Sequence, residues 1–118
     1  MKCILTALYI LTTPLSAFAA GNSPLATGLG MTSCDQFLKS VRASPEMEDK
    51  YFEWAQGYMA GMNAMFGPAR FQPKDLTAMK FPAQKTIIRD FCKSHPVEDY
   101  ETAVPGVYVL LPVAKRQQ

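Results

Sequence analysis

The segment from Ser44 to Gly67 constrains the fold more than any other stretch, because it has the pattern of a long amphipathic helix. Ser44 is a favourable N-cap, and Pro45 fits the first helical position, where its missing N–H costs no hydrogen bond. Gly67 followed by Pro68 is a typical end signal. Large side chains recur at steps of three and four along one face, so we expect the rest of the chain to pack around this helix. These side chains are Met47, Tyr51, Trp54, Tyr58, Met62 and Met65.

A shorter helix is expected before the central one. Ser33 and Gln36 have the spacing of a capping box, so this helix begins at Thr32 or Ser33. It ends near Ala43, because the residue before a proline is disfavoured in the helical conformation. The preceding residues 21–31 are rich in small and turn-forming side chains, which predicts a flexible leader.

Two more helices are expected after the central one. Residues 68–82 contain three prolines and predict a loop, with one short helical turn near its end. Pro82 begins the third helix, and Pro96 stops it. The last segment keeps helical spacing on both sides of Pro105, which favours a helix that is broken or kinked there, although residues 107–111 alone also fit a strand.

These patterns predict an all-α fold: a small single-domain bundle of about four helices around the long central helix. The expected domain spans residues 32–113, and residues 114–118 form a frayed tail. A chain of this size buries only a modest core, so a covalent cross-link would contribute strongly to its stability.

The first twenty residues have the pattern of a secretory signal peptide. Lys2 gives a positive start, residues 4–11 are mostly apolar, and Ala-Phe-Ala at 17–19 matches the small-x-small cleavage pattern. The apolar run is too short to cross a membrane. We therefore expect cleavage after Ala19 or Ala20 and a periplasmic or secreted protein.

Cysteine and charge counts narrow the possible functions. Of the 3 cysteines, Cys3 would leave with the signal peptide, and Cys34 and Cys92 are then better explained as a disulfide than as a metal site or a nucleophile. Removing Lys2 leaves 11 of the 12 Lys and Arg against 10 Asp and Glu. Such a balance argues against nucleic-acid binding and against polybasic membrane attachment.

No motif for a cofactor, a metal or a catalytic group is found in the sequence. His95 is the single histidine, and a positive charge at a helix C-terminus is a sufficient role for it. The acidic residues near the start of the central helix are best explained as a solvated first turn; they are Glu46, Glu48 and Asp49. The sequence therefore predicts a protein that is not an enzyme and that needs no cofactor and no metal.

One stretch of the central helix is the candidate binding or packing face. Gly57 and Gly61 are four residues apart, and glycine inside a helix costs roughly 1 kcal/mol relative to alanine. We expect a neighbouring helix of the same chain to pack closely there, with an intermolecular contact as the alternative. Asn63 is expected to bond the backbone of the following loop rather than a ligand. The full set is Trp54, Gly57, Tyr58, Gly61, Met62 and Asn63.

Three motifs carry a family resemblance. They are Cys34 near the mature start, the pattern W-x-x-G-Y-x-x-G-x-N at 54–63, and the aromatic-Cys-x-x-His-Pro run at 91–96. With them, the chain resembles a group of short exported bacterial proteins of undefined function.

Two looser resemblances bear on the role. Residues 33–38 are similar to the opening of the HdeA/HdeB-type periplasmic acid-stress chaperones, which are disulfide-closed helical domains. Residues 57–61 are similar to the glycine helix of Rap/Tai-type immunity proteins, which block a secreted toxin, although this chain lacks further cysteines expected of that group. Together with the absence of a catalytic motif, the resemblances favour a non-enzymatic exported module with a protein-binding or protective role, such as an immunity-like inhibitor of a partner protein. An acid-stress chaperone is the alternative, and an enzyme is the least favoured class.

Overall fold

The structure is a computed structural model that describes residues 28–66 and 72–115. Within these ranges the chain forms four α-helices and no strand, which confirms the predicted all-α class. The expected signal peptide lies outside the described residues. The elements are η1 (Gly28–Met31, a 3-10 helix), α1 (Cys34–Ala43), α2 (Met47–Phe66), α3 (Phe81–Ser94) and α4 (Tyr100–Leu110).

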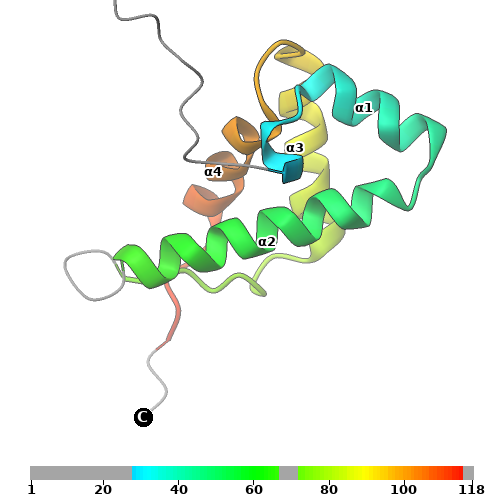
Figure 1. Cartoon of the computed structure of the whole chain (residues 1–118). Helices are drawn as coiled ribbons and strands as arrows, with labels where there is room; N and C mark the ends of the chain where they lie inside the picture. Colours follow the sequence, from blue (N-terminus) through cyan, green and yellow to red (C-terminus); the bar gives the residue numbers. More distant parts are fainter. Residues whose placement is uncertain (1–27, 67–71, 116–118) are drawn as a thin grey trace, which may run out of the picture.

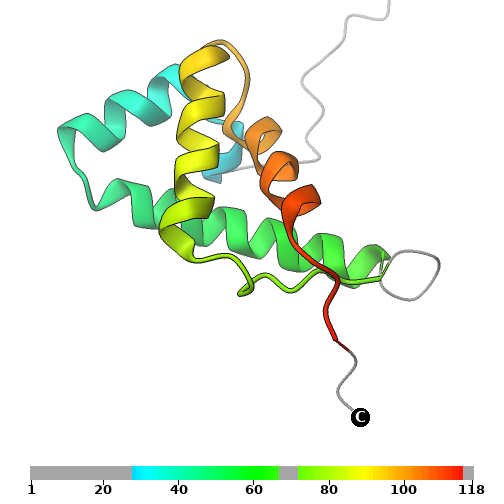
Figure 2. The ribbon, with the colours of Figure 1, turned by 180° about the vertical axis from the view of Figure 1, so that it is seen from behind.

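The long helix α2 is the element around which the others are arranged (Figure 1). α1 folds back over the N-terminal part of α2, and α3 and α4 lie side by side across it, as the view from behind also shows (Figure 2). α1 and α4 each contact both α2 and α3, and η1 contacts α2 and α4. The core therefore lies on one side of α2.

The helix starts follow the predicted signals, with one shift. Ser33 caps α1, because its hydroxyl accepts a hydrogen bond from the backbone N–H of Gln36 at 3.2 Å. α2 begins at Met47 rather than at Pro45. The residues before it form a turn, in which the N–H of Met47 bonds the Ser44 carbonyl at 2.9 Å. The helix therefore begins further along the chain than the sequence predicted.

α4 is one continuous helix from Tyr100 to Leu110, with Pro105 inside it. The predicted helix is confirmed and is not broken at this proline, and residues 107–110 are helical rather than a strand. Val104 and Val107 on either side of Pro105 are fully buried. The burial of these side chains offsets the free-energy cost of the backbone hydrogen bond that proline cannot donate.

The buried side of α2 is rotated from the predicted one. The helix buries Tyr51, Phe52, Ala55 and Met59, whereas Met65 is 70% exposed. The small Ala55 lies in the centre of the core, so large side chains alone did not mark the inward face. Trp54, Tyr58 and Met62 are half-buried along the edge of the core.

A disulfide between Cys34 and Cys92 joins α1 to α3, as predicted. Both cysteines are fully buried, and the cross-link spans 58 residues of sequence. Backbone hydrogen bonds reinforce the junction, since the Cys34 N–H bonds the Glu98 carbonyl at 2.7 Å and the Tyr100 N–H bonds the Thr32 carbonyl at 2.8 Å. The start of α1 is therefore held both covalently and by hydrogen bonds.

The end of the predicted flexible leader is ordered. Residues 28–31 form η1, whereas residues 21–27 lie outside the described residues. Gly30 is buried against the Trp54 indole, where a Cβ would lie 2.0 Å from the ring. Only glycine allows this close approach. Ala114 in the predicted frayed tail is also held, because its N–H bonds the Pro73 carbonyl at 2.8 Å.

Candidate functional site

The structure divides the six predicted face residues into three groups. Trp54 and Tyr58 stack with ring centroids 5.2 Å apart, and η1 lies against Trp54. Asn63 belongs to a polar network. Gly57 and Gly61 are exposed, and Met62 is half-buried beside them.

The packing predicted for the two glycines is wrong. Among the described residues, nothing outside the helix's own neighbouring backbone lies within 4 Å of a Cβ built on Gly57 or on Gly61. Successive residues of a helix are rotated by about 100°, so Gly57 is turned by about 200° from the buried residues Ala55 and Met59. The two glycines therefore lie on the side of α2 that faces away from the core.

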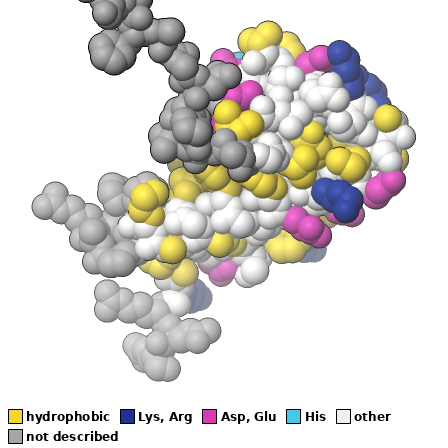
Figure 3. Space-filling model, viewed as in Figure 1, with side chains coloured by type: hydrophobic (Ala, Val, Ile, Leu, Met, Phe, Trp, Pro, Cys, Tyr) yellow, Lys and Arg dark blue, Asp and Glu magenta, His cyan; other side chains and the backbone are white. Residues whose placement is uncertain are grey.

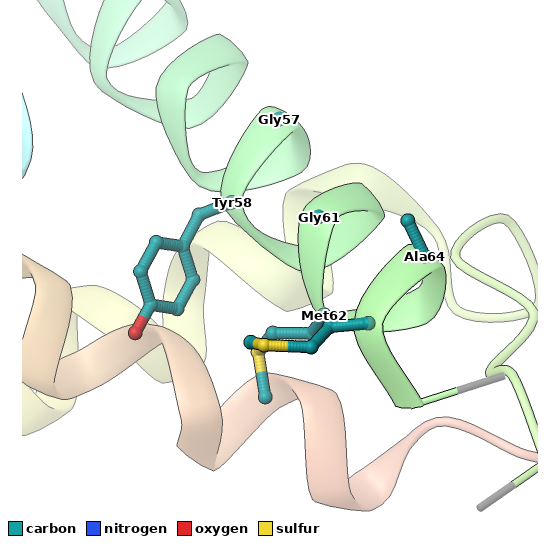
Figure 4. A pocket seen from close by; sticks show the side chains of 6 residues that line it. Gly57, Tyr58, Gly61, Met62 and Ala64 are labelled. Carbon is teal, nitrogen blue, oxygen red and sulfur yellow. The ribbon is translucent and has the colours of Figure 1, made fainter. Parts of the chain in front are cut away.

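An apolar hollow of about 660 Å³ lies beside these glycines. In Figure 4, Tyr58 and Met62 extend from α2 towards α4, while Gly57 and Gly61 leave the helix backbone bare. All of the described residues that line the hollow belong to α2, so no other described element closes it. We call this set the open face: Gly57, Tyr58, Gly61, Met62, Ala64 and Met65.

The open face belongs to a part of α2 that carries no charge. Residues 54–66 contain no Asp, Glu, Lys or Arg, whereas residues 46–53 contain five. Most charged side chains visible in Figure 3 lie towards the α1 end of the molecule, and apolar side chains follow α2 away from it. An uncharged helix segment with an open solvent side is typical of a surface that becomes covered.

Asn63 holds the backbone after the loop, as predicted. Its amide donates to the Lys74 carbonyl at 2.9 Å, and its oxygen accepts from the Lys74 N–H at 2.8 Å. The Tyr108 hydroxyl donates to the same oxygen at 2.8 Å, and the Lys74 ammonium donates to the Leu111 carbonyl at 2.8 Å. This network ties the end of α2 to the end of α4.

Sequence reasoning missed Lys74 and Tyr108, and also missed a buried glutamine. Gln84 is fully buried; its amide donates to the carbonyls of Leu76 and Met79, and its oxygen accepts from Gln56 at 2.9 Å. Gln84 is four residues before Ile88 and eight before Cys92, both of which are buried. This helical spacing places Gln84 on the buried side of α3, so the sequence did contain a signal for it. No local pattern marks Lys74 or Tyr108.

The acidic first turn of α2 has a structural role that the prediction of a solvated turn did not include. Glu48 forms an ion pair with Arg89, and Asp49 forms one with Lys85, so both pairs join α2 to α3. The Glu48 side chain is only 19% exposed. Glu46 differs, because a hydrogen bond from the Ser44 hydroxyl holds the pKa of this exposed carboxyl below its usual value.

Cys92, His95 and Tyr100 are each engaged in structural contacts. Cys92 is part of the disulfide, so it forms no pair with His95. The His95 ring stacks on Phe91 with centroids 4.2 Å apart, and its Nδ1 lies 3.0 Å from the Phe91 carbonyl. Burial raises the pKa of the Tyr100 hydroxyl above its usual value, and the charge of Glu48 has a smaller effect in the same direction. Within residues 28–66 and 72–115, no three His, Cys, Asp or Glu side chains gather as metal ligands would.

Comparison of this chain with protein-family models, with curated proteins and with solved structures finds no match.

Proposed function

We propose that this chain is a non-enzymatic exported module that binds another protein through the open face, as an immunity-like inhibitor of its partner. The observation that carries the proposal is the uncharged part of α2, residues 54–66, whose solvent side no described residue covers. Scattered exposed apolar residues are ordinary, but a contiguous apolar surface with a hollow marks an interaction site.

The cost of the glycines supports the same proposal. Gly57 and Gly61 each weaken the isolated helix by roughly 1 kcal/mol relative to alanine, and no packing within the described chain offsets this cost. A partner segment that packs against the bare backbone would offset it in the complex. Gly57 and Gly61 would then favour binding rather than folding.

The surroundings of the open face favour a preformed surface. The two ion pairs with α3 fix the start of α2, the Asn63 network fixes its end, and the disulfide joins α1 to α3 beside it. A surface that is already ordered loses little conformational entropy on binding. Persistent order is what an inhibitor of another protein requires.

Two further features support an exported protein without catalytic activity. A disulfide is typical of small exported domains, and none of the described helices has both the length and the hydropathy needed to cross a membrane. Cys92 cannot act as a nucleophile while it is held in the disulfide, and the ring of its neighbour His95 is stacked on Phe91.

The test is site-specific photo-crosslinking in the native cell. A photoreactive side chain at Ala64, which lines the hollow, should give one dominant protein adduct; at the exposed Ala43 of α1 it should not. The identified partner is then purified and titrated calorimetrically with the wild type and with Gly61→Glu. We expect the charged variant to weaken binding at least about 10-fold, because an unpaired carboxylate would be desolvated. Equal adducts at both positions, or equal affinities, would refute the proposal.

An aggregation assay separates the proposal from an acid-stress chaperone. Such a chaperone exposes apolar surface when its carboxylates are protonated, so it would suppress aggregation of an unfolding client at pH about 2–3 and not at pH 7. The binding module proposed here should show no such acid-specific suppression. Strong suppression confined to acid would replace the proposal with the chaperone function.

A further inference from the structure

We propose that Met65 is a site of reversible oxidation, and that its conversion to the sulfoxide by a peroxide weakens binding at the open face. The inference rests on the proposed function, because it assigns a means of regulation to the same surface. It does not depend on the identity of the partner, since any protein that binds this face covers an apolar surface.

Exposure distinguishes Met65 from the other sulfur-containing side chains that the structure describes. Met65 is 70% exposed, and Met31 follows at 38%. Both described cysteines are buried in their disulfide. A peroxide must reach the sulfur in order to oxidise it, so among these residues it should react first at Met65. The other four described methionines are half-buried or fully buried: Met47, Met59, Met62 and Met79.

The position of Met65 allows oxidation without damage to the fold. It lies in the last turn of α2, which ends at Phe66, and it is not among the described residues that pack against the core. A sulfoxide there stays hydrated in the free protein. The same change at the fully buried Met59 would place an unpaired polar group inside the core. Oxidation of Met65 therefore changes the surface of the protein and leaves its stability the same.

The surface that would change is the open face itself. Met65 lines the hollow beside Met62, and residues 54–66 contain no charged side chain. A sulfoxide adds a strong hydrogen-bond acceptor to this apolar surface. Tyr58, the one side chain of the open face with a hydroxyl, lies seven residues away, roughly 10 Å along the helix. A bound partner would therefore desolvate the sulfoxide oxygen without a donor from this chain, and we expect the affinity to fall about 10-fold or more.

The reaction needs a peroxide and no catalytic group of the protein. A lone pair on Sδ of Met65 attacks one oxygen of hydrogen peroxide, and the O–O bond breaks. The hydroxide that leaves takes up the proton of the transferred oxygen, so the products are the sulfoxide and water. The sulfur loses two electrons and the peroxide gains them. A methionine sulfoxide reductase reverses the change with two thiols, which become a disulfide while the oxygen leaves as water.

Peptide mass mapping tests the site. The folded mature protein is treated with hydrogen peroxide for graded times and digested with trypsin, and fragmentation of the peptide 51–70 locates the added oxygen. The sulfoxide should form at Met65 at least about 10-fold faster than at Met59, and also faster than at Met31. A methionine sulfoxide reductase with a thiol reductant should restore Met65. Equal rates at Met65 and Met59 would refute the site.

The effect on binding is tested with the partner identified by the cross-link at Ala64. Its affinity for the chain is measured by calorimetry before and after peroxide treatment. The wild type and the control Met31→Leu should each lose about 10-fold or more on treatment, whereas Met65→Leu should show no change. Circular dichroism should show the same helix content before and after treatment, and a loss of helix would refute the proposal.

The outcomes separate this inference from the proposed function. A treated wild type that binds as tightly as the untreated protein, or a Met65→Leu protein that loses as much affinity as the wild type, would refute the oxidation switch and leave the proposed function intact. The absence of a dominant adduct at Ala64 would refute both.

Discussion

The two halves of α2 differ in the side chains that they present to the core and to the outer side of the helix. In the first half, Tyr51 and Phe52 are buried in the core, while Glu48 and Asp49 form ion pairs with α3. In the second half, residues 54–66 carry no charge, and the side turned away from the core is glycine, alanine and methionine. The first half of the helix is thus paired with α3, whereas no described residue covers the outer side of the second half.

This difference indicates which half serves the fold and which is available for binding. Charged side chains on the outer side of a helix keep it soluble and discourage wrong contacts. The second half lacks them, although it is well anchored through Asn63 and Met59. A binding partner therefore explains the composition of residues 54–66 better than stability does, and substitutions in and around both halves test this division.

The largest expected effect is at the disulfide. Replacing both Cys34 and Cys92 by alanine should lower the free energy of unfolding by about 4 kcal/mol, because the cross-link closes a long loop of the unfolded chain. Urea denaturation of the mature protein measures this change, and amide exchange should show that α1 loses protection before residues 54–66 do. Two reactive thiols in the unreduced, denatured wild type would show that the cross-link is not formed.

The next effect tests how the open half is anchored. Asn63→Ala should cost about 2–3 kcal/mol, because it leaves the N–H and carbonyl of Lys74 and the Tyr108 hydroxyl without a partner. Tyr108→Phe removes a single hydrogen bond and should cost about 1 kcal/mol. If urea denaturation gives equal losses for the two variants, Asn63 does not hold the loop backbone as described.

Two glycine substitutions should change stability in opposite directions. Gly30→Ala should destabilise by about 1–3 kcal/mol, because its Cβ would overlap the Trp54 ring. Gly61→Ala should stabilise by up to about 1 kcal/mol, because nothing described lies within 4 Å and alanine favours the helix. Chemical denaturation of both variants checks the signs. A destabilised Gly61→Ala would mean that the open face is covered within the monomer.

The smallest expected effect on stability is at Ser44 and Glu46, just before the first half of α2. The Ser44 hydroxyl lowers the pKa of Glu46, so Ser44→Ala should raise this pKa, as measured by NMR titration. A lowered pKa in the folded state adds stability that is present above the unfolded value of about 4.5 and is lost as the pH falls through the folded value. The variant should therefore lose slight stability near neutral pH and none in strong acid. An unchanged Glu46 pKa would contradict this assignment.

The sequence predicted much of the fold because its signals are local. Ser33 caps α1, and Pro82 lies in the first turn of α3 as expected. The pairing of Cys34 with Cys92 follows from there being only two cysteines in the expected mature chain. The Asn63 bond to the loop backbone was also predicted, since an amide late in an apolar helix needs a nearby polar partner.

The sequence by itself determined that this chain is a small all-α domain with a long central helix and a disulfide, because helix caps, prolines and periodicity act over a few residues. Only the tertiary structure decided which side of α2 is buried, and hence that no described residue packs against Gly57 or Gly61. Apolar residues occupy nearly the whole circumference of residues 54–66, so periodicity could not choose between the sides. The positions of η1, α1 and α4 made that choice, because these elements pack against α2 and bury Ala55 and Met59 in the core.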